Sequence, residues 1–135
     1  MNDFQLMELA NFLSSARRTA QELNKALAED DLREDLWRIL MCLSQADGMS
    51  MGQISEALVL PHATTTRLID EMTDSAMVFR RPSPHDGRKA IVYISQRGAE
   101  KLRRVNGVLT TRMGPSLQGL ASTRAMPPLA EAHGA

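Results

Sequence analysis

The chain has 135 residues, with 16 Lys and Arg against 16 Asp and Glu, three His and one Cys. This length and a hydrophobic content of 43% suit one folded domain and exclude a disordered chain. A single cysteine excludes an intramolecular disulfide framework and is typical of a reducing cytoplasm. No apolar run approaches the roughly 20 residues of a membrane span, and Asp3 and Glu8 are incompatible with a signal peptide. We therefore expect a cytoplasmic protein without a membrane partner.

The charge is unevenly distributed along the chain. Residues 1–59 carry 5 basic and 10 acidic residues, residues 60–104 carry 9 and 5, and residues 105–135 carry 2 and 1. A basic middle segment predicts an anionic partner there, with a solvated basic face as the alternative. Charge alone does not decide between them.

The first element expected is a long helix with one apolar stripe. Asn2 or Asp3 can cap its start, and the pattern stops near Asp30. A helix this long at the start of a small chain is hard to cover within one subunit. We therefore expect residues 1–31 to be a dimerisation helix, with packing on a later helix of the same chain as the alternative. Spacings of three and four define its stripe, which is Leu6, Leu9, Leu13, Ala16, Ala20, Leu23 and Leu27.

The middle of the chain predicts two short helices joined by a tight turn. A second long helix is expected from about 32 to 45, and Ser50 then begins a short helix. The next helix covers about 61–74, with Pro61 at its first position, where proline is tolerated. This is the outline of a helix-turn-helix. The inward positions of the two short helices are Ile54, Leu58, Leu68, Ile69 and Met72.

The periodicity changes after Ser75. Residues 77–81 and 90–94 predict two strands around a turn-rich loop, which together form a β-hairpin with a protruding tip.

A last long helix is expected after the hairpin. Ser95 caps it, and Leu102, Val105 and Leu109 continue the spacing of three and four. Pro115 should end or kink this helix. Residues 116–126 then form one more short helix, and residues 127–135 form a loose tail.

The order helix, helix-turn-helix, hairpin and long helix resembles the MarR family of bacterial transcriptional regulators. The resemblance covers about residues 32–105 and is strongest in the recognition helix and in the Asp-x-Arg signature of the wing, the hairpin loop. The matching positions are Thr64, Thr66, Arg67 and Asp70 in the helix, Asp86 and Arg88 in the wing, and the segment 95–98 after it.

The resemblance implies a fold that is mainly α-helical with a small β-hairpin. A winged helix-turn-helix lobe at residues 32–95 would lie between the N-terminal dimerisation helix, residues 1–31, and the C-terminal dimerisation helices, residues 96–126. Two residues depart from the family pattern. Ala76 stands where the family commonly has glycine, and Gly87 replaces a frequent second arginine in the wing. If position 76 needs a left-handed backbone, alanine costs about 1 kcal/mol there.

The recognition helix begins with three adjacent threonines, residues 64–66, followed by Arg67. Hydroxyls and free backbone N–H groups at a helix start can reach phosphates or base edges, and a threonine methyl can touch a thymine methyl. The alternatives are that one threonine merely caps the helix and that Arg67 pairs with Asp70 or Glu71. The predicted DNA contacts of this helix are His62, Thr64, Thr65, Thr66 and Arg67.

The wing adds a second set of predicted contacts. Arg88 at the loop tip can enter a narrow A·T-rich minor groove. Asp86 is expected to accept a hydrogen bond from Arg88 or another arginine and so to hold the loop. Arg80 and Arg81 lie on opposite strand faces, so we expect only one of them to point at DNA. The predicted DNA contacts of the wing are Arg81, Asp86, Arg88 and Lys89.

Two further sets of residues concern assembly and regulation. The resemblance suggests a small aromatic effector between the dimer helices and the DNA-binding lobe, and Trp37 and Phe12 could line such a cleft. Core packing is the alternative for Trp37, and no effector-binding residue is assigned. The predicted dimer contacts are Leu6, Leu9, Leu13, Ala16, Ala20, Leu23, Leu102, Val105 and Leu109.

These features predict a sequence-specific DNA-binding transcriptional regulator. We expect a homodimeric repressor of a roughly palindromic operator, relieved by a small ligand, with activation left open. Enzymatic activity is not expected, because the three histidines lack a nearby nucleophile or base partner, and no cofactor or metal motif is present. The alternatives are a winged-helix protein-interaction module and a thiol-redox regulator acting through Cys42.

Overall fold

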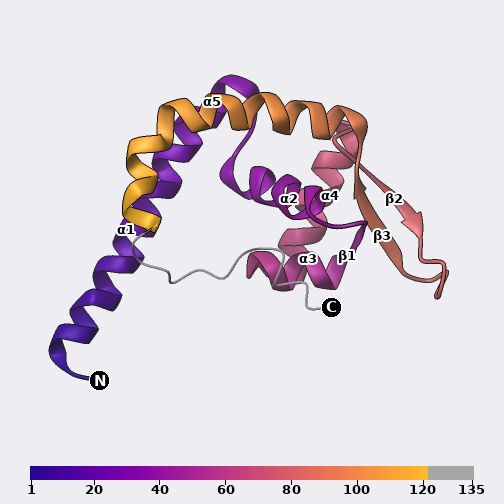
Figure 1. Cartoon of the computed structure of the whole chain (residues 1–135). Coiled ribbons are helices and arrows are strands. Elements are labelled where there is room, and N and C mark those ends of the chain that lie inside the picture. Colours follow the sequence, from indigo (N-terminus) through magenta and orange to yellow (C-terminus); the bar gives the residue numbers. More distant parts are fainter. Residues whose placement is uncertain (122–135) are drawn as a thin grey trace.

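The computed structural model describes residues 1–121 of the chain, with side chains to residue 114. Figure 1 shows the chain as a helical lobe with a β-hairpin at its side, crossed by a long C-terminal helix that comes to lie along the N-terminal helix. The mainly helical fold with a small antiparallel sheet is therefore confirmed. Its elements are α1 (Asp3–Leu27), the 3-10 turn η1 (Ala28–Asp30), α2 (Glu34–Ser44), β1 (Met49–Ser50), α3 (Met51–Leu58), α4 (His62–Asp74), β2 (Val78–Pro82), β3 (Ala90–Ile94) and α5 (Gln96–Ala121).

Helix α1 begins at a capping box. The Asn2 side chain accepts a hydrogen bond from the Gln5 N–H at 2.8 Å, and the Asn2 N–H donates to the Gln5 side chain at 2.9 Å. The reciprocal bonds satisfy donors that a helix start leaves unpaired. Of the two caps considered from the sequence, Asn2 is therefore the correct one. Only Ala26 and Leu27 of α1 are buried, so most of the helix projects from the lobe (Figure 1).

The helix-turn-helix forms as the sequence predicts, with small shifts at its ends. Ser50 caps α3 through a second capping box with Gln53. Pro61 is the residue before α4 rather than its first residue, and the left-handed Val59 (φ +55°) makes the turn between the two helices. The predicted inward residues are all buried, with exposed fractions of 2% or less for Ile54, Leu58, Leu68, Ile69 and Met72.

The sheet has three antiparallel strands in the order β1–β3–β2. The predicted hairpin pairs Val78 with Ile94 and Pro82 with Ala90. Strand β1 was not predicted, and it pairs Met49 with Val92. Gly48 precedes it at φ +86°, and a Cβ there would lie 2.6 Å from the Ile91 side chain. Glycine therefore allows β1 to lie close against β3.

The core gathers α2, the helix-turn-helix and the inner face of α5. Leu36, Ile39, Leu40 and Leu43 of α2 are buried, and Cys42 has no exposed surface. In α5, the predicted stripe of Leu102, Val105 and Leu109 is buried in the same cluster, together with Met113. Within the described residues, no helix combines the length and the apolar character that a membrane crossing requires.

Helix α5 starts as predicted but ends differently. The Ser95 Oγ accepts from the Gly98 N–H at 2.9 Å and donates to the Ala76 carbonyl at 2.6 Å. A Cβ at Gly98 would lie 2.2 Å from the Met77 carbonyl oxygen, so this first turn needs glycine.

Of the two outcomes expected at Pro115, an end or a kink of the helix, the end is wrong, because α5 continues through it to Ala121. A proline inside a helix removes one hydrogen bond, which a bend can accommodate, and Figure 1 shows α5 changing direction in its last third. Residues 116–121 therefore belong to α5 and not to a separate helix. The expected remainder of that helix, residues 122–126, and the tail, residues 127–135, lie outside the described residues.

Candidate nucleic-acid interface

The N-terminal end of α4 presents a polar surface with unpaired backbone donors. Thr65 is the first residue of α4 whose N–H bonds back along the chain, to the Pro61 carbonyl at 3.0 Å. Residue 61 provides no side-chain cap. The N–H groups of residues 62–64 therefore emerge from the positive end of the helix, where anions bind favourably.

The three threonines at this end do not all face the solvent. Thr64 and Thr66 are partly exposed, and the Thr66 hydroxyl donates to the His62 carbonyl at 3.1 Å. Thr65 has no exposed surface, and its hydroxyl donates to the Pro61 carbonyl at 3.1 Å. The assignment of Thr65 as a DNA contact is therefore wrong. Thr65 has a structural role, but it does not cap the helix, so the alternative that one threonine merely caps α4 is not confirmed either.

Arg67 is exposed on α4 and forms no hydrogen bond or ion pair with the residues that the structure describes. The two carboxylates proposed as its alternative partners are engaged elsewhere. Asp70 forms an ion pair with Arg80 of β2, and Glu71 forms one with Arg33 at 2.9 Å. The guanidinium of Arg67 is thus available to a ligand outside the chain.

The wing is a closed loop between β2 and β3. The Ser83 N–H donates to the Lys89 carbonyl at 2.8 Å, and the Lys89 N–H donates to the Asp86 carbonyl at 3.0 Å. The Asp86 side chain accepts from the backbone N–H of Arg88 at 3.1 Å. Asp86 thus holds the loop as expected, but through the main chain of Arg88 and not its guanidinium.

Basic side chains gather on this hairpin. Arg88 and Lys89 are exposed near the tip, and Arg81 lies with its guanidinium carbon 4.8 Å from the centre of the Phe79 ring. Of the adjacent arginines 80 and 81, Arg80 forms an ion pair with Asp70. A surface hollow of the hairpin is lined by Arg80, Arg81, Pro82, Gly87, Arg88, Lys89 and Ala90. Four cations around one hollow create a positive potential suited to phosphate.

Ala76 adopts the conformation that its position suggested. Its φ is +62°, in the left-handed region. Its N–H donates to the Thr73 carbonyl and the next N–H, of Met77, donates to the Met72 carbonyl at 2.9 Å. This pair of bonds is the Schellman end of a helix, which favours glycine. The substitution of alanine there therefore strains the junction between α4 and β2.

The predicted dimer contacts fall into two groups. On α1, side chains of the apolar stripe are exposed, with 50% of Leu6, 50% of Leu9 and 55% of Leu13 accessible. Leu102, Val105 and Leu109 are at most 7% exposed because they pack in the core of their own chain. These three are therefore wrong as direct dimer contacts. Phe4 and Met7, which were not among the predicted contacts, are 70% and 60% exposed on the same helix.

Trp37 and Cys42, which the sequence raised as an effector contact and a redox site, both pack against other parts of the chain. The Trp37 indole N–H donates to the Asn106 side chain at 2.9 Å, which joins α2 to α5 and supports the packing alternative. Cys42 is buried in α2, and burial raises the pKa of its thiol. Within residues 1–121, no group of three or more His, Cys, Asp or Glu side chains is placed to hold a metal ion.

No sequence pattern pointed to Arg33 as a functional residue. It lies between η1 and α2, 38 residues before Glu71, and no local pattern joins the two positions. By contrast, Thr65 was recognisable as buried, because it precedes Leu68, Ile69 and Met72 by three, four and seven residues on one helix face.

Comparison with known proteins places these features in a family. A model described as "MarR family" matches residues 37–89, which hold the helix-turn-helix and the wing loop. The HTH-type transcriptional repressor IacR of Pseudomonas putida is 28% identical over 107 residues, which is 79% of this chain. The matched region spans 64% of the length of that relative.

Solved structures share the fold at low identity. A cysteine-to-serine mutant of MarR from E. coli has a TM-score of 0.76 at 17% identity over 91% of each chain. The same mutant complexed with operator DNA has a TM-score of 0.75 at 16% identity, covering 93% of this chain and 100% of that one. The transcriptional repressor CouR bound to a 23-mer DNA duplex has a TM-score of 0.75 at 22% identity, covering 91% of this chain and 88% of that one. Together, these findings show that residues 37–89 match the MarR family and that the chain has the winged helix-turn-helix fold of the MarR structures.

Proposed function

We propose that this chain is a dimeric, sequence-specific DNA-binding repressor, in which α4 enters a major groove and the wing reaches the adjacent minor groove. One observation carries the proposal. Arg67 is free on the exposed face of α4, while the carboxylates beside it are held by Arg80 and Arg33. Because the nearby carboxylates are paired elsewhere, the Arg67 guanidinium remains available to DNA on the same helix whose first N–H groups are unpaired.

The chemistry of α4 suits the floor of a major groove. Arginine donates two hydrogen bonds to guanine, and threonine contacts either a base edge or a thymine methyl. We assign these roles to Arg67 and to the partly exposed Thr64 and Thr66. The free N–H groups at the start of α4 would hold a backbone phosphate, which fixes the register of the helix on the duplex.

The wing suits a narrow minor groove. An exposed guanidinium is attracted to the enhanced negative potential of A·T-rich segments, and Arg88 occupies the loop that Asp86 holds in shape. Arg81 and Lys89 would neutralise backbone phosphates. Each such contact steepens the dependence of affinity on salt by about one unit in the log–log slope.

A second copy of the chain is the proposed occupant of the exposed stripe on α1. Leu6, Leu9 and Leu13 are half exposed, and they lie on a helix that stands away from the lobe in Figure 1. Isolated surface leucines are common, but a continuous apolar stripe of this length is typical of an interface. A symmetric pair would set two recognition helices about one helical turn apart, on a roughly palindromic operator.

The direction of regulation is proposed from the relatives. IacR and CouR are both named repressors, and a protein that covers a promoter blocks transcription. Relief by a small aromatic ligand is a separate part of the proposal, supported by the family resemblance. Such a ligand would act by favouring a dimer in which the recognition helices are mis-spaced. A regulator that works on DNA would act in the cytoplasm of a bacterium.

The test is a selection of binding sites from random duplex DNA with purified protein, at two salt concentrations. We expect a two-fold symmetric site to be enriched, with an affinity that falls steeply as salt rises. Weak, salt-sensitive binding with no enriched sequence, in the presence and absence of cell extract, would contradict the proposal and favour a protein-interaction module. Titration of the selected complex with salicylate-like compounds tests the ligand proposal separately.

A further inference from the structure

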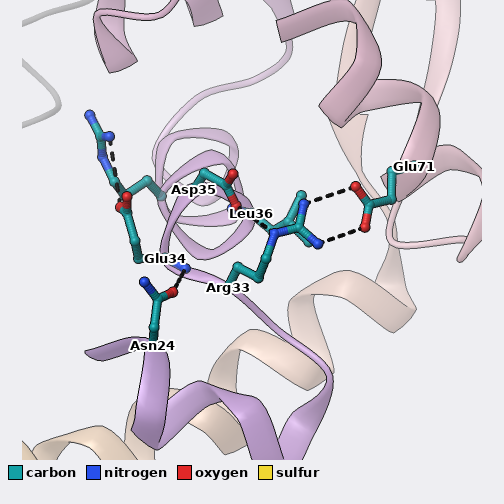
Figure 2. A network of polar contacts seen from close by, with 7 residues as sticks. Asn24, Arg33, Glu34, Asp35, Leu36 and Glu71 are labelled. Atoms are coloured by element: carbon teal, nitrogen blue, oxygen red, sulfur yellow. Dashed lines mark hydrogen bonds and ion pairs between the residues drawn. The ribbon is translucent and has the colours of Figure 1, made fainter. Parts of the chain in front are cut away.

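A bidentate ion pair joins the start of α2 to the recognition helix. Figure 2 shows the Arg33 guanidinium facing the Glu71 carboxylate across the gap between the two elements. Its Nη1 and Nη2 donate to Oε1 and Oε2 of Glu71, both at 2.9 Å. Two parallel bonds of this kind fix both side chains more firmly than a single contact does.

Arg33 is itself held in place. Its Nε lies 3.4 Å from the Asp35 carboxylate. The next residue, Glu34, donates its backbone N–H to the Asn24 side chain of α1 at 2.7 Å, so the start of α2 is fixed to α1 (Figure 2). The backbone next to Arg33 is therefore fixed to α1, and the guanidinium contacts the carboxylates of Asp35 and Glu71.

Glu71 lies within reach of a second arginine. It follows Arg67 by four residues, and side chains at this spacing are neighbours on a helix surface. The hydrogen bond from Arg33 chiefly lowers the pKa of the Glu71 carboxyl, and the charge of Arg67 lowers it further. Both arginines are thus electrostatic partners of the Glu71 carboxylate. In this structure Arg33, and not Arg67, forms the hydrogen bonds with it.

We propose that Arg33 is a positioning residue for DNA binding, which occupies Glu71 and so leaves the guanidinium of Arg67 free to contact the operator. Without Arg33, the unpaired Glu71 carboxylate captures Arg67 within α4 and draws it away from the DNA. The inference rests on the proposed function, because it concerns the availability of one DNA contact.

A purely structural role makes different predictions. If the ion pair served only to hold α2 against α4, removing either partner would have the same effect on DNA binding. Competition for Glu71 predicts opposite outcomes, because removal of the carboxylate eliminates the competitor of the DNA. The two roles are therefore distinguished by which partner of the ion pair is removed.

The experiment measures operator affinity and its salt slope for five variants of the full chain. We expect Arg33→Ala and Arg67→Ala each to weaken binding about tenfold and to reduce the salt slope by about one. Glu71→Gln should bind at least as tightly as the unaltered chain, and Arg33→Ala/Glu71→Gln should regain that affinity. Arg33→Ala/Arg67→Ala should be no weaker than Arg67→Ala alone.

The control is Arg103→Ala, which removes an exposed positive charge from α5 and has no ion pair among the described residues. It should leave affinity within about twofold. Urea unfolding of each variant identifies changes that come from stability. Equal losses in Arg33→Ala and Glu71→Gln, or additive losses in Arg33→Ala/Arg67→Ala, would overturn the inference. If the unaltered chain selects no operator, the proposed function fails instead, so the two failures are distinguishable.

Discussion

The Asp70 carboxylate on α4 forms an ion pair with the Arg80 guanidinium on β2. The recognition helix and the first strand of the wing are therefore joined by charge as well as by packing. Because α4 and the wing are proposed to read different grooves, we expect this ion pair to help set the angle between α4 and the wing. Its partners are partly exposed, so we expect a modest energetic role and a larger effect on geometry.

Asp70→Asn tests this geometric role. The variant frees Arg80 and loosens the wing against α4, so operator affinity should fall while affinity for an unrelated duplex rises slightly through the lost negative charge. We expect the specificity ratio, which is the dissociation constant for the unrelated duplex divided by that for the operator, to fall about threefold to tenfold. Asp74→Asn is the matched control, since it removes the same charge from the end of the same helix. A specificity ratio that changes equally in both variants would show that the Asp70–Arg80 pair has no positioning role.

Ala76→Gly should stabilise the protein by about 1 kcal/mol, because alanine at φ +62° has a strain that glycine lacks. Equilibrium unfolding in urea measures the change. Ala99→Gly is the control with the opposite sign, because Ala99 lies inside the regular helix α5 and glycine there costs about 1 kcal/mol. Destabilisation by Ala76→Gly would contradict the strain at this helix end.

Leu6→Ala/Leu9→Ala/Leu13→Ala should convert a dimer to a monomer with its lobe intact. These side chains are exposed in the single chain, so their truncation removes proposed interface area without opening the core. Sedimentation equilibrium gives the mass, and urea unfolding of the monomer gives its stability. Val105→Ala, at a position with 1% exposure, should instead lower stability by about 1–2 kcal/mol without changing the mass at concentrations where the protein is folded. A triple variant that stays dimeric would exclude this face of α1 as the interface.

The Cys42 thiol should react slowly in the native protein. It is fully buried, and burial raises its pKa, so little of the reactive thiolate is present at neutral pH. We expect modification by a thiol reagent to be on the order of 100-fold slower in buffer than in denaturant, since it requires local opening of α2. Rapid modification of the native protein, with loss of DNA binding, would favour the redox alternative raised by the sequence.

The elements that the sequence predicted best are those with a strong local signal. Capping residues such as Asn2 and Ser50 set the starts of α1 and α3, and regular apolar spacing set the buried faces. The left-handed backbone at Ala76 followed from a departure at one position of a known pattern. Strand β1 has two residues and too little sequence for a period to show, so its pairing with β3 was invisible.

The errors in the predicted site have two physical causes. A stripe such as Leu102, Val105 and Leu109 shows that a helix face is covered, but not whether the same chain or a partner covers it. The pairing of Arg33 with Glu71 depends on how α2 and α4 meet in the fold, which no local pattern encodes. Thr65 is a different case. Its spacing from Leu68, Ile69 and Met72 already indicated the buried face of α4, but the three adjacent threonines were interpreted together as DNA contacts.

The most direct test of this account is a hydroxyl-radical footprint of the selected operator, for the unaltered chain and for Arg88→Ala. We predict two symmetric protected segments for α4 about one helical turn apart, each flanked by a protected minor-groove segment. In Arg88→Ala the flanking protection should disappear while the central protection persists at higher protein concentration. A single asymmetric footprint, or flanks that are unchanged in Arg88→Ala, would contradict a dimer that reads DNA through α4 and the wing.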